Sequence, residues 1–120
     1  MTKFVVDTNV LLRFLTNADP VKAKRAETLF RQATKYQIQL IISLLVIAEI
    51  VWTLESFYHL GKTDIASKVE TILNTPNLLC PEAEIIVMAL DLYVQGNMDF
   101  IDAFHAHDLQ TQGLSQIANL

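Results

Sequence analysis

Short β-prone runs of apolar residues alternate along this chain with longer segments that have helical spacing or clear helix ends. The short runs lie at residues 3–6, 39–43, 78–80 and 114–118. The second run is apolar throughout its middle, which is typical of a parallel strand covered by helices on both faces. We therefore predict a central parallel sheet of about four strands.

The segments between these runs carry the signals of helix ends. Asp19 followed by Pro20 is an N-cap acid with a proline at the first helical position. Ser43 can cap the helix after the second strand, Gly61 interrupts the chain before a further helix, and Gly96 ends another. The predicted helices cover residues 9–15, 20–35, 45–57, 63–73, 82–95 and 99–113.

Strands and helices alternate along the whole chain, which predicts an α/β fold with helices on both faces of a parallel sheet. No repeat, low-complexity segment or Gly/Ser-rich linker occurs, so we expect residues 1–120 to form a single domain. In such sheets the functional side chains lie beyond the carboxyl ends of the strands. Polar residues that directly follow a strand are therefore the first candidates for chemistry.

The composition is that of a globular protein. Hydrophobic residues make up 52% of the 120 residues and charged residues 18%, unlike a disordered chain. The N-terminal residues lack the pattern of a signal peptide, and the most apolar stretch, residues 40–52, is too short to span a bilayer. The single cysteine, Cys80, cannot form an internal disulfide and is expected to be a small buried hydrophobic residue. We expect a soluble, cytoplasmic protein.

Charge is distributed unevenly, although the net charge is only −4. Residues 69–120 contain seven acids and no lysine or arginine, whereas residues 1–35 hold seven of the nine basic residues. These seven are Lys3, Arg13, Lys22, Lys24, Arg25, Arg31 and Lys35. They form either a solvated helix face or a flank that contacts phosphates beside an acidic site. A negative total does not exclude a nuclease, because a site that recruits cations needs acidic surroundings.

Asp7 directly follows the first predicted strand. An acid at the end of an apolar run is costly unless the site is open or the charge is paired. Asp7 could instead cap the short helix that follows, but Thr8 or Asn9 could do this equally well. Asp7 is therefore a candidate for chemistry.

Glu49 lies inside the apolar segment LLVIAEIVWTL. A lone glutamate with apolar neighbours on nearly every side is unfavourable unless it is paired or bound to a cation. The alternatives are an exposed stripe of the helix or a buried ion pair. We favour a metal ligand.

Asp99 and Asp102 lie three residues apart in NMDFIDAFHAHD and can share one face at the start of a helix. Alone they are explained as an N-cap and a first-turn acid. Together with Asp7 and Glu49 they indicate a metal site, because clustered carboxylates stay ionised only when a cation offsets their repulsion. Mg²⁺ and Mn²⁺ prefer such oxygen ligands, lower the pKa of a bound water and bridge to phosphates.

Other chemistries fit the chain less well. His105 and His107 are two residues apart on a predicted helix and point to different faces, which is poor geometry for zinc. No Ser-His pair or activated cysteine competes as a nucleophile. A haloacid-dehalogenase phosphatase needs a second aspartate two residues after the first, where this chain has Asn9, and a later lysine than Lys68. A receiver domain also needs a late lysine.

Three segments together resemble the PIN-domain family, and more closely the VapC-type toxins of prokaryotic toxin–antitoxin pairs. They are FVVDTNVLLRFL at the start, LVIAEIVWTL in the middle and MDFIDAFHAHDL near the end. The resemblance covers essentially the whole chain in order and spacing. It implies a PIN-like three-layer α/β/α fold and an endoribonuclease that depends on Mg²⁺ or Mn²⁺. It also implies an RNA substrate, a cognate antitoxin and a homodimer.

The same resemblance implies roles for individual residues. The acidic metal ligands of the family correspond to Asp7, Glu49 and Asp102, with Asp99 as an accessory acid. Thr8 and Asn9 correspond to the polar pair that supports the first aspartate, so both would be supporting residues. The first three acids would form the catalytic site.

One departure from the family pattern concerns the end of the chain. Family members usually continue into a segment that adds a further acid and often a fifth strand, whereas this chain ends in SQIANL. The resemblance therefore indicates an apparently truncated C-terminus, a missing fourth acid and an edge strand without a neighbour. The alternative function is a catalytically weak or inactive PIN scaffold that acts as a protein- or RNA-binding module.

Overall fold

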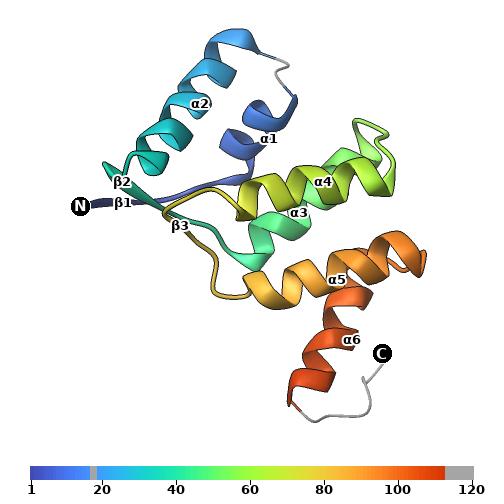
Figure 1. Ribbon diagram of the computed structural model, residues 1–120. Coiled ribbons are helices and arrows are strands. Elements are labelled where there is room, and N and C mark those ends of the chain that lie inside the picture. Colours follow the sequence, from blue (N-terminus) through green and yellow to red (C-terminus); the bar gives the residue numbers. More distant parts are fainter. Residues whose placement is uncertain (17–18, 113–120) are drawn as a thin grey trace.

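The computed structural model describes residues 1–16 and 19–112, with side chains described as far as residue 108 (Figure 1). The described part contains six helices, and each begins and ends within one residue of its predicted bounds. They are α1 (Thr8–Thr16), α2 (Pro20–Thr34), α3 (Leu44–Ser56), α4 (Lys62–Leu73), α5 (Ala83–Gln95) and α6 (Phe100–Gln112). No helix within the described ranges is long and apolar enough to cross a membrane.

Three parallel strands form the sheet within the described residues, in the order β1-β2-β3. These are β1 (Thr2–Val5), β2 (Ile38–Ile41) and β3 (Leu78–Leu79), close to three of the predicted runs. The fourth predicted strand, at residues 114–118, lies outside the described residues. β1 pairs in register with β2 from Thr2 opposite Ile38 onward, and β2 pairs with β3 from Leu40 opposite Leu78. The α/β prediction is confirmed, and the described sheet has one strand fewer than the predicted four.

Local signals in the sequence explain where the helices begin and end. The Asp19 carboxylate accepts the N–H of Lys22 at 3.2 Å, and the Ser43 hydroxyl accepts the N–H of Val46 at 3.3 Å. Both predicted N-caps are therefore confirmed. Gly96 ends α5 as predicted, and a Cβ atom at this position would lie 2.8 Å from the Leu92 carbonyl oxygen. The close approach of that carbonyl is the reason why glycine is needed there.

Helices lie on both sides of the sheet, with α1 and α2 on one side and α3, α4 and α5 on the other (Figure 1). Phe14 of α1 stacks on Phe30 of α2, with 4.2 Å between ring centroids, and joins the first pair. The largest fully buried side chains come from α1, from β2 and the residue after it, and from α3 to α5. They are Tyr93, Leu11, Leu40, Ile42, Ile47, Ile50, Leu54, Ile65, Ile72, Ile86, Leu90 and Val51. This is the three-layer α/β/α arrangement that the resemblance implied.

Two regions depart from a fully covered sandwich. All four residues of β1 are exposed, and within the described residues β1 pairs with a strand on only one edge. α6 packs mainly on α5 and contacts α3 less extensively, so most of it extends away from the sheet (Figure 1). The position of α6 matters for the site, because its first turn carries Asp102.

Candidate metal centre

Asp7 lies where β1 leads into α1. The backbone N–H of Val6 donates to the Ile41 carbonyl at 2.8 Å, so the sheet ladder continues up to the residue before Asp7. The Asp7 Oδ1 atom then accepts the N–H of Val10 at 3.0 Å, which makes Asp7 the cap of α1. The expectation that Thr8 or Asn9 would cap this helix is wrong, because the helix begins at Thr8 itself. Within the described residues the other carboxylate oxygen, Oδ2, accepts no hydrogen bond, and the Asp7 side chain is exposed.

Glu49 of α3 contacts the residue that follows Asp7 in the chain. Its Oε2 atom accepts a hydrogen bond of 2.6 Å from the Thr8 hydroxyl, 41 residues away in the chain. Glu49 is exposed, whereas Ile47 and Ile50 on either side of it are buried in the core. Glu49 thus lies on an exposed stripe of the helix, one of the alternatives left open, and the apolar residues that share this face, Leu45 and Trp52, are exposed as well. Exposure leaves this carboxylate open to water and ions.

Thr8 joins the two acidic residues into one arrangement. It follows Asp7 directly in the chain and orients Glu49 through its hydroxyl. The resemblance implied that Thr8 and Asn9 support the first aspartate, but the side chain of Thr8 contacts the glutamate. Asn9 is exposed, and no side-chain hydrogen bond involves it within the described part of the chain. The structure thus brings together Asp7, Thr8 and Glu49 at the start of α1.

Asp99 and Asp102 lie at the start of α6, and both are exposed. The backbone carbonyl of Asp99 accepts the N–H of Ala103 at 2.9 Å, so Asp99 occupies the capping position that its place in the sequence predicted. A small pocket of about 80 Å³ lies between the start of α6 and the middle of α3, and Ala48 and Glu55 are among the α3 residues that line it. In the described residues, however, no three His, Cys, Asp or Glu side chains lie close enough to hold a metal ion. Asp99 and Asp102 are therefore not assembled with Asp7 and Glu49 in this conformation.

A polar network that the sequence did not reveal holds the start of α6. The Lys62 ammonium donates to the Met98 carbonyl at 3.0 Å and lies 4.4 Å from the centroid of the Tyr93 ring. The Tyr93 hydroxyl donates to Glu55 of α3 at 2.5 Å. Burial, and secondly this hydrogen bond to a carboxylate, raise the pKa of Tyr93 far above its usual value, so it remains a neutral donor. The network fixes the turn before Asp99 to α3, α4 and α5.

The roles of Lys62 and Tyr93 were missed in the sequence because their partners are distant in the chain. Lys62 and Met98 are separated by 36 positions, and Tyr93 and Glu55 by 38. A lysine at the first turn of a helix is an ordinary surface residue when only its neighbours are considered. The one available sign was a tyrosine within the apolar face of α5, since a buried tyrosine hydroxyl usually requires a partner.

Cys80 does not add a nucleophile to the site. It is buried and free, as expected. Burial raises the pKa of its thiol, which keeps the sulfur protonated and weakly reactive near neutral pH.

The donor set at the start of α1 suits a hard divalent cation. Asp7 and Glu49 each commit one oxygen to a hydrogen bond that fixes the side chain, and both carboxylates face solvent. Mg²⁺ is commonly bound in proteins by one or two carboxylates, with water and substrate phosphates as the remaining ligands. Two oriented carboxylates therefore fit Mg²⁺ or Mn²⁺ chemically, and a third from α6 would strengthen the site.

Comparison with known proteins identifies the family. The family model of the PIN domain matches residues 4–119, a range that contains Asp7, Glu49, Asp99 and Asp102. A VapC ribonuclease from Aquifex aeolicus (strain VF5) is 29% identical over 115 residues, which cover 96% of this chain and 84% of that relative. The match extends over nearly all of the sequence, in agreement with the three-layer fold. This chain belongs to the PIN-domain family.

Proposed function

We propose that this protein is an endoribonuclease that depends on Mg²⁺ or Mn²⁺ and cuts RNA phosphodiester bonds. Asp7, Glu49 and Asp102 are the proposed catalytic metal ligands, with Asp99 as an accessory acid. The observation that carries the proposal is the contact of Thr8 with Glu49, which joins two acids from distant parts of the chain beside the end of β1. Family membership and the name of the relative, VapC ribonuclease, support the reaction type.

Each residue of this arrangement has a distinct task. The Val10 N–H holds one oxygen of Asp7, and Thr8 holds one oxygen of Glu49, so both carboxylates are oriented before an ion arrives. A bound divalent ion would lower the pKa of a coordinated water molecule and offset the charge of the scissile phosphate. Asn9 is a candidate for a supporting contact to RNA or water, since it is exposed beside Asp7.

Asp102 must approach the other two acids to complete the site. It lies in the first turn of α6, and the residues just before it line a small pocket together with Ala48, the neighbour of Glu49 on α3. We propose that the start of α6 shifts toward Glu49 when metal and RNA bind. The contact of Lys62 with the Met98 carbonyl would set how far this turn can move.

The direct test is metal-dependent cleavage by the purified protein. A labelled single-stranded RNA should be cut when Mg²⁺ or Mn²⁺ is present, and adding an excess of chelator should abolish the cutting. Denaturing gel electrophoresis of the products over time gives the rate. Cleavage that persists at full rate in the chelator, or no cleavage with either metal, would contradict the proposal.

One observation favours a second candidate, a catalytically weak or inactive scaffold that binds RNA or protein. Within the described part of the chain, three acids are not gathered closely enough to hold an ion. A scaffold of this kind would bind its partner without cutting RNA, and Mn²⁺ would not raise its thermal midpoint. An active nuclease with a metal centre should show such a rise, because an ion that binds only the folded state stabilises it.

We further propose that the protein acts in the cytoplasm as the toxin of a toxin–antitoxin pair, restrained by a cognate antitoxin protein. The similarity to a VapC ribonuclease over 96% of the chain supports this role. Expression of the chain alone in a bacterial host should arrest growth if it is such a toxin. Normal growth at high levels of soluble protein would count against the toxin role and not against metal-dependent cleavage itself.

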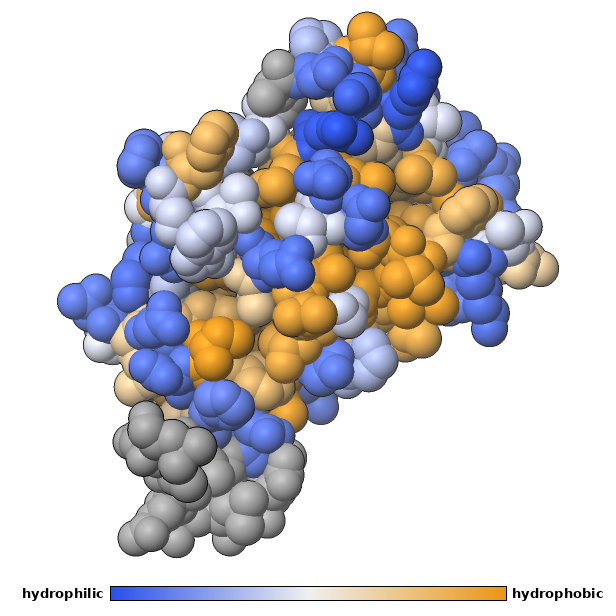
Figure 2. Space-filling model, turned by 180° about the vertical axis from the view of Figure 1, so that it is seen from behind, coloured by the Kyte–Doolittle hydropathy of each residue, from blue (hydrophilic) through white to orange (hydrophobic). Residues whose placement is uncertain are grey.

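We also propose a homodimer, on the basis of the exposed apolar surface. Figure 2 shows apolar side chains gathered across the middle of the face opposite to that in Figure 1. On α3, Leu45 and Trp52 are 68% and 67% exposed and flank Glu49 on one face of the helix, so an interface there would lie beside the candidate metal centre. Large exposed apolar areas mark interaction sites. Sedimentation velocity should give twice the chain mass of 13.5 kDa, and Trp52→Glu should shift it toward the monomer.

A monomer at all accessible concentrations would contradict the dimer. A useful matched substitution is Phe57→Glu, which also places a charge on an exposed aromatic residue, just beyond the end of α3. It should leave the sedimentation coefficient unchanged if the face with Leu45 and Trp52 forms the interface.

A further inference from the structure

A groove between α1 and α2 lies next to the candidate metal centre. It encloses about 210 Å³, with Val10 and Arg13 on the α1 side and four residues of α2 opposite. The α2 residues are Lys22, Arg25, Ala26 and Leu29. Valine, alanine and leucine supply apolar surface, and the three basic residues supply charge. The groove therefore combines an apolar lining with three cations.

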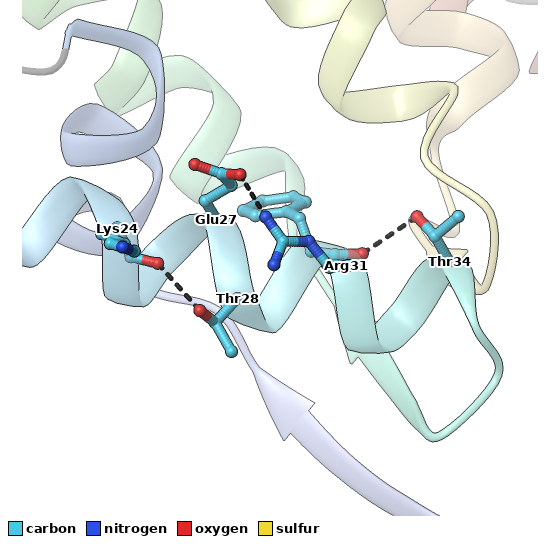
Figure 3. Close-up of polar contacts among 6 residues, drawn as sticks. Lys24, Glu27, Thr28, Arg31 and Thr34 are labelled. Carbon is cyan, nitrogen blue, oxygen red and sulfur yellow. Dashed lines mark hydrogen bonds and ion pairs between the residues drawn. The ribbon is translucent and has the colours of Figure 1, made fainter.

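None of the three cations is neutralised by an acid within the described residues. The ion pairs there join Arg31 to Glu27 and Lys68 to Asp64, and neither involves the groove. Figure 3 shows the contrasting stretch of α2, where the Arg31 guanidinium is held by Glu27 and the Thr28 and Thr34 hydroxyls donate to carbonyls of their own helix. The three basic groups that line the groove are therefore available to an external anion.

The groove is connected to the carboxylates through one residue. Val10 lines it and also donates its backbone N–H to Asp7 at 3.0 Å. Arg13 follows Val10 by one helical turn on the same face of α1. A row of positive charge therefore begins within about two turns of the acid that caps α1.

We propose that this groove binds the sugar–phosphate backbone of the RNA substrate and leads it to the metal centre. The inference rests on the proposed nuclease function. Arg13, Lys22 and Arg25 contact consecutive phosphates, since arginine and lysine are the usual phosphate ligands of proteins. The carboxylates of Asp7 and Glu49 lie next to the groove and favour RNA over an acidic peptide as its ligand. A divalent ion held by these carboxylates would attract a further phosphate of the RNA, whereas carboxylates without an ion repel an acidic peptide.

The test measures RNA binding separately from cleavage. Fluorescence anisotropy of a labelled single-stranded RNA is recorded in excess chelator, so that no metal-dependent cutting occurs. The groove variant combines Arg13→Gln, Lys22→Gln and Arg25→Gln. The control variant combines Lys3→Gln, Lys35→Gln and Lys68→Gln. It removes the same number of positive charges as the groove variant, at positions that do not line the groove. Circular dichroism and thermal melting verify that both variants are folded.

The proposal predicts that the groove variant loses at least about tenfold in affinity and the control less than about threefold. Each lost phosphate contact should also reduce the slope of log affinity against log salt by about 0.7, or about 2 for all three. Equal losses in both variants would overturn the groove, since net charge alone would then explain binding. Unchanged RNA affinity of the groove variant would overturn it as well.

A third arm tests the other class of ligand. Unchanged RNA affinity of the groove variant, together with loss of binding to a synthetic poly-glutamate peptide, would assign the groove to an acidic protein segment and overturn the RNA proposal. Failure of the nuclease function appears differently, as RNA that binds through the groove but stays intact when Mn²⁺ is added. The two failures are therefore distinguishable.

Discussion

Replacing Asp7 with asparagine should reduce the rate of RNA cleavage more than about 100-fold. Even groups that only orient a metal ligand contribute roughly 10–100-fold to affinity or activity, so loss of a ligand charge should cost at least that much. Asparagine caps helices as well as aspartate does, so the hydrogen bond from the Val10 N–H and the stability of α1 should survive. The substitution thus separates the metal-binding role from the capping role.

The chain offers a matched control for this substitution. Asp19 caps α2 through its contact with the Lys22 N–H, just as Asp7 caps α1. Asp19→Asn makes the same chemical change at a helix start without touching the carboxylate pair, and its cleavage rate should stay within about twofold of the parent. Single-turnover rates on labelled RNA measure both variants. An Asp7→Asn protein that cuts RNA as fast as Asp19→Asn would show that the site is assigned wrongly.

Replacing Ile50 with alanine should lower the free energy of unfolding by about 2–5 kcal/mol, the usual cost of removing a large aliphatic side chain from a core. Ile50 is only 1% exposed, although it is adjacent to exposed Glu49 on α3. Urea denaturation followed by circular dichroism measures the change. The metal centre should be affected only through the lower population of folded protein.

Glu49→Gln is the corresponding control on the other face of α3. It keeps the size of the side chain and a hydrogen-bond acceptor for Thr8, so it should change the free energy of unfolding by less than about 0.5 kcal/mol. It should nevertheless impair cleavage strongly. If Ile50→Ala cost less than Glu49→Gln in stability, the assignment of the inner and outer faces of α3 would be wrong.

Helix ends could be predicted from the sequence because their signals are local. Asp19 before Pro20, Ser43 before α3 and Gly96 after α5 each act within a few residues of the helix that they delimit. The order of strands and helices followed from the same kind of information. Prediction was therefore most accurate where a side chain bonds to backbone three or four positions away.

The geometry of the candidate site could not be predicted from the sequence. Asp7 was chosen as a candidate for its place after a strand, and Glu49 for its apolar neighbours. Of these, Ile47 and Ile50 are buried in the core, whereas Leu45 and Trp52 are exposed on the same face of α3 as Glu49. The Thr8 contact spans 41 positions and depends on how α1 packs on α3. Such contacts arise from tertiary packing, for which a single sequence carries no local signal.

The position of α6 illustrates the same limit. The sequence places Asp102 at a helix start, and this is correct. Its distance from the other acids depends on contacts that Lys62 and Tyr93 make across the chain. Whether Asp102 can join Asp7 and Glu49 therefore depends on packing between α6 and α3.

We propose that Asp7, Glu49 and Asp102 together hold a divalent ion. Anomalous X-ray diffraction from crystals grown with Mn²⁺ tests it most directly, because the signal locates the metal independently of the protein atoms. We expect a peak coordinated by oxygens of Asp7 and Glu49, with the start of α6 moved so that Asp102 supplies a further ligand. Mn²⁺ bound elsewhere, or a peak that touches neither Asp7 nor Glu49, would contradict it.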